Sequence, residues 1–158
     1  MFVVARAVIY ATLFIGLVLI FVPSRVLSSS GVLAPKTIGL WQATGILLAV
    51  AGAALAVSCI VAFALVGKGT PAPFDPPRRL VVRGLYRYVR NPMYIGAGLA
   101  MTGAALFYQS FALFAYVGVF FLVSHLFVAA YEEPTLRRSF GNDYEAYCDE
   151  VRRWWPKR

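Results

Sequence analysis

Residues 84–98 read Gly84-Leu85-Tyr86-Arg87-Tyr88-Val89-Arg90-Asn91-Pro92-Met93-Tyr94-Ile95-Gly96-Ala97-Gly98. The first half of this stretch is basic and aromatic, and after Pro92 it becomes an apolar run. A simple membrane anchor needs no dense polar motif where a span begins. The stretch therefore indicates a site built at the membrane surface. A second polar cluster, Glu132-Glu133, follows the last apolar run of the chain.

The composition indicates a membrane protein. Of the 158 residues, 60% are hydrophobic, whereas soluble domains average about 45–50% apolar residues. The formal net charge is +8. In a membrane protein we attribute such a charge to anionic lipid headgroups and topology, so we expect membrane lipids and no nucleic acid as partners. The length suits one membrane domain over residues 1–158.

Four apolar runs predict an all-α, multi-pass bundle with about four transmembrane helices, because about 20 apolar helical residues span a bilayer. They cover residues 2–22, 38–66, 93–107 and 110–131. The first is longer than the apolar region of a cleaved signal peptide, and Pro23 with Ser24 should end it. The third is short for a full span. Only Tyr108-Gln109-Ser110 separates the last two runs, which predicts a tight helical hairpin.

The second run and the segment after it carry different signals. Small residues at Gly45, Ala49, Gly52, Ala53 and Ala56 predict close contact with a neighbouring helix. The segment 67–83 contains four prolines, which forbid a regular helix, so it should lie along the membrane surface.

The tail, residues 134–158, is predicted to be amphipathic. Apolar side chains recur every three or four positions, at Leu136, Phe140, Tyr144, Tyr147 and Val151. Pro134 should begin a tail helix and Gly141 should divide it. Trp154-Trp155, followed by basic residues, is typical of an interfacial anchor.

Four spans return the chain to its starting side, so the loop 67–92 and the tail should share that side. Together they carry most of the basic residues. The positive-inside rule then places both termini and the polar clusters in the cytoplasm, with the loop 23–37 outside.

The glutamate pair allows two interpretations. In the first, Glu132 and Glu133 pair with Arg87 or Arg90 and so fix the loop against the hairpin. In the second, they bind a cationic or amine-bearing ligand. His125 lies seven residues before Glu132, on roughly the same helical face. It either hydrogen-bonds a neighbouring helix or takes part in catalysis.

Two further patterns bear on possible sites. The pair Gly96-x-Gly98 suits helix packing or the close approach of a ligand to the backbone. No metal site is expected, because no second His or Cys falls at ligand spacing.

Two motifs in order flank the hairpin. They read Tyr86-x-x-x-Arg90-Asn91-Pro92-Met93-Tyr94-x-Gly96 and Glu132-Glu133-x-x-Leu136-x-x-x-Phe140-Gly141-x-x-Tyr144-x-x-Tyr147-x-x-x-Val151-x-Arg153. This pattern resembles the isoprenylcysteine carboxyl methyltransferase family. The related phospholipid methyltransferases share the core of both motifs, including the glycine pair and the glutamate pair. The resemblance covers roughly residues 78–156.

The resemblance implies an integral membrane methyltransferase that uses S-adenosyl-L-methionine. Residues 1–66 would form two N-terminal transmembrane helices, and residues 67–158 would form the cofactor-binding catalytic core. The cofactor-binding residues would be Leu80, Val81, Tyr86, Arg90, Asn91, Pro92, Met93, Tyr94, Gly96, Gly98, Glu132 and Glu133. The catalytic candidates are Arg153 and His125. The methyl acceptor would be a lipophilic small molecule or lipid that enters from the bilayer.

Two departures from the family pattern bear on the acceptor. Asn91 stands where the eukaryotic carboxyl methyltransferases have His, and residues 127–130 lack the arginine that those enzymes carry there. Both departures favour a bacterial-type relative in the inner membrane, with a carboxylate, amine or thiol acceptor other than prenylcysteine. One alternative is a non-enzymatic binding or scaffold protein that keeps the fold. A lipid transporter is less favoured, because the spans carry almost no charge.

Overall fold

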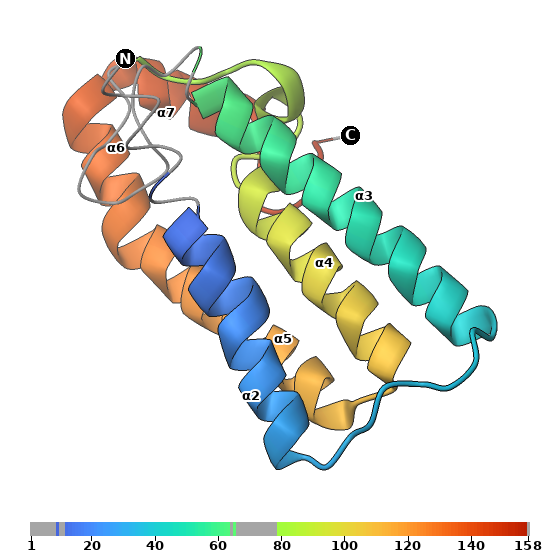
Figure 1. Cartoon of the computed structure of the whole chain (residues 1–158). Helices are drawn as coiled ribbons and strands as arrows, with labels where there is room; N and C mark the ends of the chain where they lie inside the picture. The colour runs from blue at the N-terminus through green and yellow to red at the C-terminus, as the bar shows by residue number, and fades with distance from the viewer. Residues whose placement is uncertain (1–8, 10–11, 64, 66–78, 158) are drawn as a thin grey trace.

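The computed structural model describes residues 9, 12–63, 65 and 79–157. Within these residues the chain is a helical bundle without a named strand, and one parallel bridge joins Val89 and Arg152. Figure 1 shows long helices side by side, with α6, α7 and the C-terminal end gathered at one end of the bundle. The predicted all-α membrane bundle is confirmed. The predicted start of the first span and the surface segment up to residue 78 lie outside the described residues, except for Ile9.

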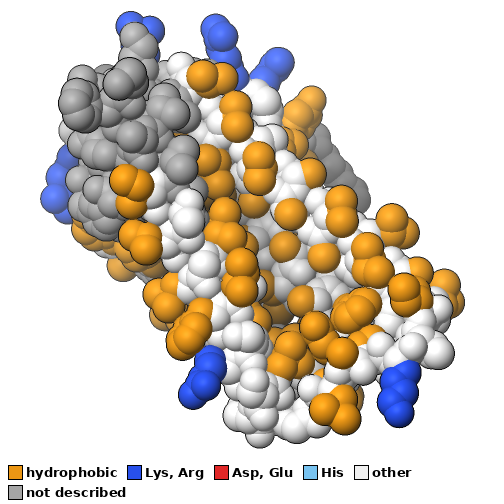
Figure 2. All heavy atoms as spheres, viewed as in Figure 1, with side chains coloured by type: hydrophobic (Ala, Val, Ile, Leu, Met, Phe, Trp, Pro, Cys, Tyr) orange, Lys and Arg blue, Asp and Glu red, His pale blue; other side chains and the backbone are white. Residues whose placement is uncertain are grey.

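Three helical stretches in the described part of the chain are long and apolar enough to cross a membrane. They are Thr12–Ser29, Leu40–Ala62 and Phe111–Phe140. The third predicted span is α4 (Pro92–Tyr108), whose 17 residues reach about 25 Å, less than the bilayer core of about 30 Å. Figure 2 shows hydrophobic side chains along the length of the bundle, with Lys and Arg side chains toward its ends.

The first helix continues past the point where the sequence predicted its end. Pro23 lies within the first turn of α2 (Val22–Ser29), which follows the π-helical segment η1 (Ile15–Phe21) directly. A membrane helix tolerates proline because local π-helical adjustments and neighbouring groups satisfy the backbone groups that proline leaves free. The prediction that Pro23 and Ser24 end this helix is therefore wrong. The segment packs on the fourth run, where the hydroxyl of Tyr116 donates to the carbonyl of Val18 over 2.9 Å.

The helices α3 (Leu40–Ala62) and α4 lie side by side in backbone contact (Figure 1). A Cβ added at Gly52 would lie 2.4 Å from the backbone nitrogen of Ala100, and one at Gly103 would lie 2.4 Å from that of Ala49. A side chain larger than hydrogen cannot fit at either glycine without moving the helices apart. The packing role predicted for the small residues is confirmed, although Ala53 is exposed.

The fourth run belongs to one continuous helix that extends into the tail. It comprises α5 (Phe111–Phe127), the π-helical turn η4 (Val128–Glu132) and α6 (Glu133–Phe140). Pro134 lies in the first turn of α6 and does not begin a separate helix, so that prediction is wrong. The predicted hairpin is present, since α5 begins only three residues after α4 ends. Gly141 divides the tail as predicted, and α7 (Asn142–Glu150) follows it.

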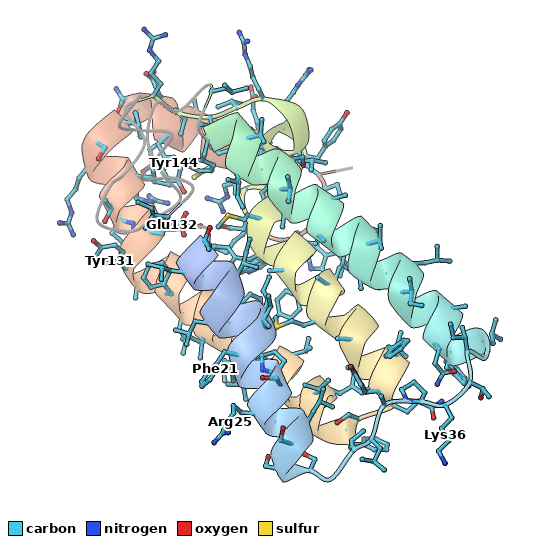
Figure 3. The ribbon with its side chains drawn as sticks, viewed as in Figure 1. Phe21, Arg25, Lys36, Tyr131, Glu132 and Tyr144 are labelled. Carbon is cyan, nitrogen blue, oxygen red and sulfur yellow. The ribbon has the colours of Figure 1, made fainter. Side chains whose placement is uncertain are left out.

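The tail packs through its apolar face, as its pattern predicted, against residues 79–91, which we call the motif loop. Tyr144, Tyr147 and Val151 are buried together, and the Tyr147 hydroxyl donates to the carbonyl of Tyr86 over 2.6 Å. Motif loop and tail thus meet at one end of the bundle. In Figure 3, Glu132 and Tyr144 lie at this end, and Arg25 and Lys36 lie at the opposite end. The loop around Lys36 is therefore on the far side of the bundle from the polar clusters.

Candidate functional site

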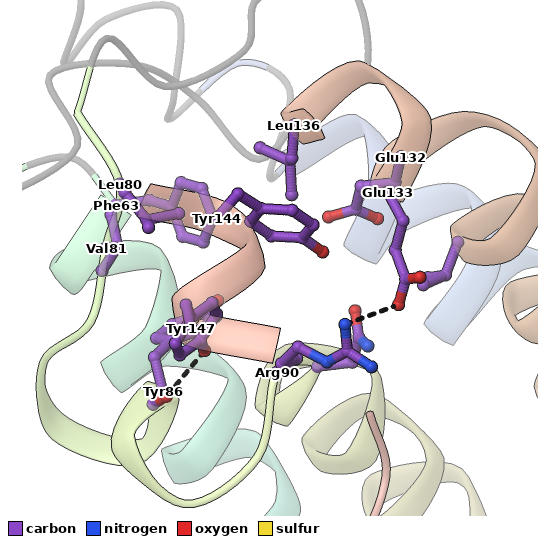
Figure 4. Close-up of a pocket in the computed structure, with 12 residues that line it drawn as sticks. Phe63, Leu80, Val81, Tyr86, Arg90, Glu132, Glu133, Leu136, Tyr144 and Tyr147 are labelled. Carbon is purple, nitrogen blue, oxygen red and sulfur yellow. Dashed lines mark hydrogen bonds and ion pairs between the residues drawn. The ribbon is translucent and has the colours of Figure 1, made fainter. Parts of the chain in front are cut away.

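A pocket lies where the motif loop, the helix Phe111–Phe140 and the tail meet (Figure 4). Its cavity volume is about 40 Å³, and the pocket is partly open to solvent. Its walls are formed by Phe63, Leu80, Val81, Tyr86, Arg90, Asn91, Val128, Glu132, Glu133, Leu136, Tyr144 and Tyr147. Segments far apart in the sequence therefore build one site.

Two arginines bind Glu133 within the wall of the pocket. Arg153 donates from Nε and Nη2 to the two carboxylate oxygens, both over 2.8 Å. Arg90 Nη1 lies 3.3 Å from Glu133 Oε1. The bonds to Glu133 raise the pKa of Arg153, and a bidentate guanidinium–carboxylate pair is a strong, directional contact. The predicted pairing of the glutamates with Arg90 exists for Glu133, whereas Arg87 is exposed.

Glu132 has a different environment from its neighbour. Its Oε2 accepts a hydrogen bond from the Tyr94 hydroxyl over 3.2 Å, and no ion pair with a described basic residue involves it. Successive residues of a helix point about 100° apart, so Glu132 and Glu133 cannot face the same group. In Figure 4 the carboxylate of Glu132 faces the pocket, while Glu133 reaches Arg90.

Arg90, which also lines the pocket, carries a donor that is not used. Its side chain is 13% exposed, and Nη1 also lies 2.6 Å from the sulfur of Cys148. Its Nε is buried and has no hydrogen-bond partner in the described part of the chain. Most buried polar groups have a partner, so an unpartnered N–H in a pocket wall indicates a place for an acceptor.

The remaining walls are mostly aromatic and apolar. Phe63 and Tyr86 meet edge to face with their ring centroids 5.3 Å apart. Burial raises the pKa of Tyr86, Tyr144 and Tyr147, so their hydroxyls are neutral at physiological pH. The charged groups of the pocket are therefore confined to the two glutamates and Arg90 among its described lining residues.

Seven of the predicted cofactor-binding residues line the pocket: Leu80, Val81, Tyr86, Arg90, Asn91, Glu132 and Glu133. The other five do not. Pro92 begins α4, Met93 packs against the buried group of Cys59, Val81 and Tyr86, and Tyr94 contacts Glu132.

The glycine pair lies in helix contacts outside the pocket. A Cβ at Gly96 would lie 2.7 Å from the backbone nitrogen of Ala56, and one at Gly98 would lie 2.1 Å from the ring of Phe121. Of the two interpretations of this pair, helix packing accounts for both glycines.

Neither catalytic candidate lines the pocket. Arg153 is engaged by Glu133, and His125 accepts a hydrogen bond at Nδ1 from the indole N–H of Trp154 over 3.0 Å. The spacing of His125 from Glu132 suggested a shared face, but the π-helical turn η4 between them has a wider turn and shifts the register. Trp154 is half-buried in this contact, whereas Trp155 is exposed, as an interfacial anchor would be.

The pocket also contains five residues that the site prediction omitted. They are Phe63, Val128, Leu136, Tyr144 and Tyr147. The last three already stood out in the amphipathic pattern of the tail, so that pattern carried a usable signal. Phe63 and Val128 lie in apolar runs, where no local feature distinguishes a pocket residue from a packing residue.

Comparison with protein families gives a match. The family model described as Phospholipid methyltransferase matches residues 40–143, more than half of the chain. Searches of curated proteins and of solved structures gave no significant match. The matched region begins at α3, earlier than the resemblance in the two motifs suggested, and it includes both the Arg90–Tyr94 motif and the glutamate pair. The chain belongs to the phospholipid methyltransferase family, whose members are membrane methyltransferases.

Proposed function

We propose that this protein is an integral membrane methyltransferase that takes its methyl group from S-adenosyl-L-methionine and transfers it to a lipophilic acceptor. The observation that carries the proposal is a pocket containing Glu132 without a basic partner and Arg90 with an unpartnered Nε among the described residues. An amino acid presents an ammonium and a carboxylate, which are the complements of these two groups.

The residues of the pocket fit this cofactor. Glu132 would hold the amino group, and the Nε of Arg90 would donate to the carboxylate. Tyr86, Phe63, Leu80 and Val81 form an aromatic and apolar wall suited to a nucleoside. When bound, the cofactor supplies a methyl group on a positively charged sulfur.

The protein's contribution to such a transfer is mainly alignment. Transfer of a methyl group requires acceptor, methyl and leaving sulfur in line, and positioned reactants can gain several powers of ten in rate. The Glu133–Arg153 pair joins the tail to the helix Phe111–Phe140, and the bond from Asn91 Nδ2 to the carbonyl of Arg153, 3.2 Å long, joins the tail to the motif loop. We propose that this fixed wall sets the position of the amino-acid end of the cofactor and excludes water from it.

The acceptor is proposed to arrive from the bilayer. The helix that spans the apolar region, Phe111–Phe140, also supplies Val128, Glu132 and Leu136 to the pocket. A lipophilic molecule can follow this helix to the site without crossing water. Its nucleophile would be a carboxylate, an amine or a thiol. We place the pocket and both termini on the cytoplasmic side of a bacterial inner membrane, because the basic residues gather around the pocket end.

Calorimetric titration with S-adenosylhomocysteine tests the cofactor assignment. Binding at micromolar to millimolar concentration is expected, and no binding at millimolar ligand would favour a scaffold protein that keeps the family fold. Incubation with radiolabelled S-adenosyl-L-methionine and total membrane lipids then tests the reaction. A labelled lipid identifies the acceptor, and the absence of any labelled product from a protein that binds the cofactor would contradict a lipid acceptor.

A further inference from the structure

Tyr94 touches the pocket only through Glu132. It does not line the pocket, but its hydroxyl donates to Glu132 Oε2 over 3.2 Å. No other hydrogen bond to the carboxylate of Glu132 occurs among the described residues. One carboxylate oxygen is therefore held from behind, and the other is available to the pocket.

The ring of Tyr94 is itself fixed by aromatic neighbours. Its centroid lies 6.4 Å from that of Trp154, edge to face, and 6.5 Å from that of Phe120. Trp154 is held in turn by its hydrogen bond to His125 and by an edge contact with Phe121, 6.4 Å between centroids. Edge-to-face aromatic pairs have preferred geometries, so this group restrains the direction of the Tyr94 hydroxyl.

We propose that Tyr94 is a positioning residue that acts through Glu132, with Trp154 as its support. The proposal rests on the proposed function, in which Glu132 binds the amino group of the cofactor. The Tyr94 hydroxyl holds the Glu132 carboxylate toward the pocket, so that its second oxygen meets the ammonium. Tyr94 makes no contact with the nucleoside. The role also explains the placement of His125, which holds Trp154 and does not reach the pocket.

The position of Tyr94 predicts a selective effect on ligands. S-adenosylhomocysteine has an amino-acid end, whereas 5′-methylthioadenosine has the same nucleoside and sulfur without it. The variant Tyr94→Phe keeps the ring and removes the hydroxyl. It should raise the Kd of S-adenosylhomocysteine about tenfold and leave the Kd of 5′-methylthioadenosine unchanged.

The matched control is Tyr116→Phe. This variant also removes one hydroxyl that donates a hydrogen bond, to Val18, but in a different part of the bundle. It should lower the thermal midpoint and change neither Kd. Trp154→Leu keeps the Tyr94 hydroxyl but removes its support, and it should weaken S-adenosylhomocysteine alone, by about threefold.

The outcomes separate this inference from the proposed function. If the unmodified protein binds neither ligand, the proposed function fails and the inference fails with it. If it binds both, and Tyr94→Phe weakens both equally, Tyr94 supports the fold or the nucleoside and the inference is overturned. The inference is also overturned if Tyr94→Phe binds both ligands as the unmodified protein does.

Discussion

The same substitution should affect mainly stability at Glu133 and mainly ligand binding at Glu132. Glu133→Gln removes the charge that compensates Arg90 and Arg153, whose side chains are 13% and 28% exposed. Breaking a buried ion pair by removing one partner costs about 3–5 kcal/mol. Because Arg153 can reach water, we expect the lower end, about 3 kcal/mol, or about 6–12 °C in Tm for a chain of this size.

Glu132→Gln removes a charge that has no basic partner among the described residues, and Gln still accepts from the Tyr94 hydroxyl. We expect it to cost less than about 1 kcal/mol of stability and to abolish calorimetric binding of S-adenosylhomocysteine. Stability is measured by thermal unfolding in detergent. Glu145→Gln is the surface control: its ion pair with Arg137 spans 2.6 Å but is half-exposed, so about 0.5 kcal/mol or less is expected.

Two results would refute this reasoning. In one, Glu132→Gln destabilises the protein as much as Glu133→Gln does, which would mean that the two carboxylates share the arginines. In the other, Glu132→Gln binds S-adenosylhomocysteine with unchanged affinity, which would remove Glu132 from the proposed site. Loss of stability confined to Glu133→Gln, with loss of binding in Glu132→Gln, supports the separate roles.

Three further substitutions test the fold. Gly52→Leu should separate α3 from α4 and lower the stability by about 3 kcal/mol or more, because its Cβ would lie 2.4 Å from the Ala100 nitrogen. The control Ala53→Leu, at an exposed position, should leave Tm unchanged. Equal losses of Tm in the two variants would contradict the close contact between α3 and α4. Tyr147→Phe should lower stability by about 1–3 kcal/mol, because it leaves the Tyr86 carbonyl without its 2.6 Å hydrogen bond. An unchanged Tm would show that water takes the place of the Tyr147 hydroxyl. Gly141→Ala should cost about 1–3 kcal/mol, because φ is +51° and ψ is −125° there; urea unfolding with no change in midpoint would contradict that backbone conformation.

The sequence predicted the helices well and two of their boundaries poorly. Apolar runs, the small residues at Gly52 and the periodicity of the tail depend on composition and spacing, which are read directly from the chain. In the sequence, Pro23 indicates a helix end and Pro134 a helix start. Each instead follows a π-helical turn and lies in the first turn of the next α-helical segment. The preceding turn decides whether a proline ends a helix, and no local pattern in the sequence marks a π-helical turn.

The site was predicted as a set of residues, but not as an arrangement. The two motifs predicted Arg90 and Glu132 in one site, and both line the pocket. The sequence could not show that Arg153 binds Glu133, because adjacent glutamates differ only in their angle around the helix. It also could not separate Tyr94, behind the carboxylate, from Tyr86, in the wall. That difference depends on how α4 is rotated against the other helices.

The contact between Arg153 and Glu133 has a consequence for biosynthesis. A ribosome makes the chain from its N-terminus, so every described helix, including the one that carries Glu133, is made before Arg153. Without Arg152 and Arg153, Glu133 lacks one of its two arginine partners, and the backbone N–H of Arg90 lacks the carbonyl of Arg152 that it bonds over 3.0 Å in the finished fold. The wall of the pocket therefore closes only after the described helices have all been synthesised. A chain that lacks Arg152 and Arg153 would therefore carry an incomplete site.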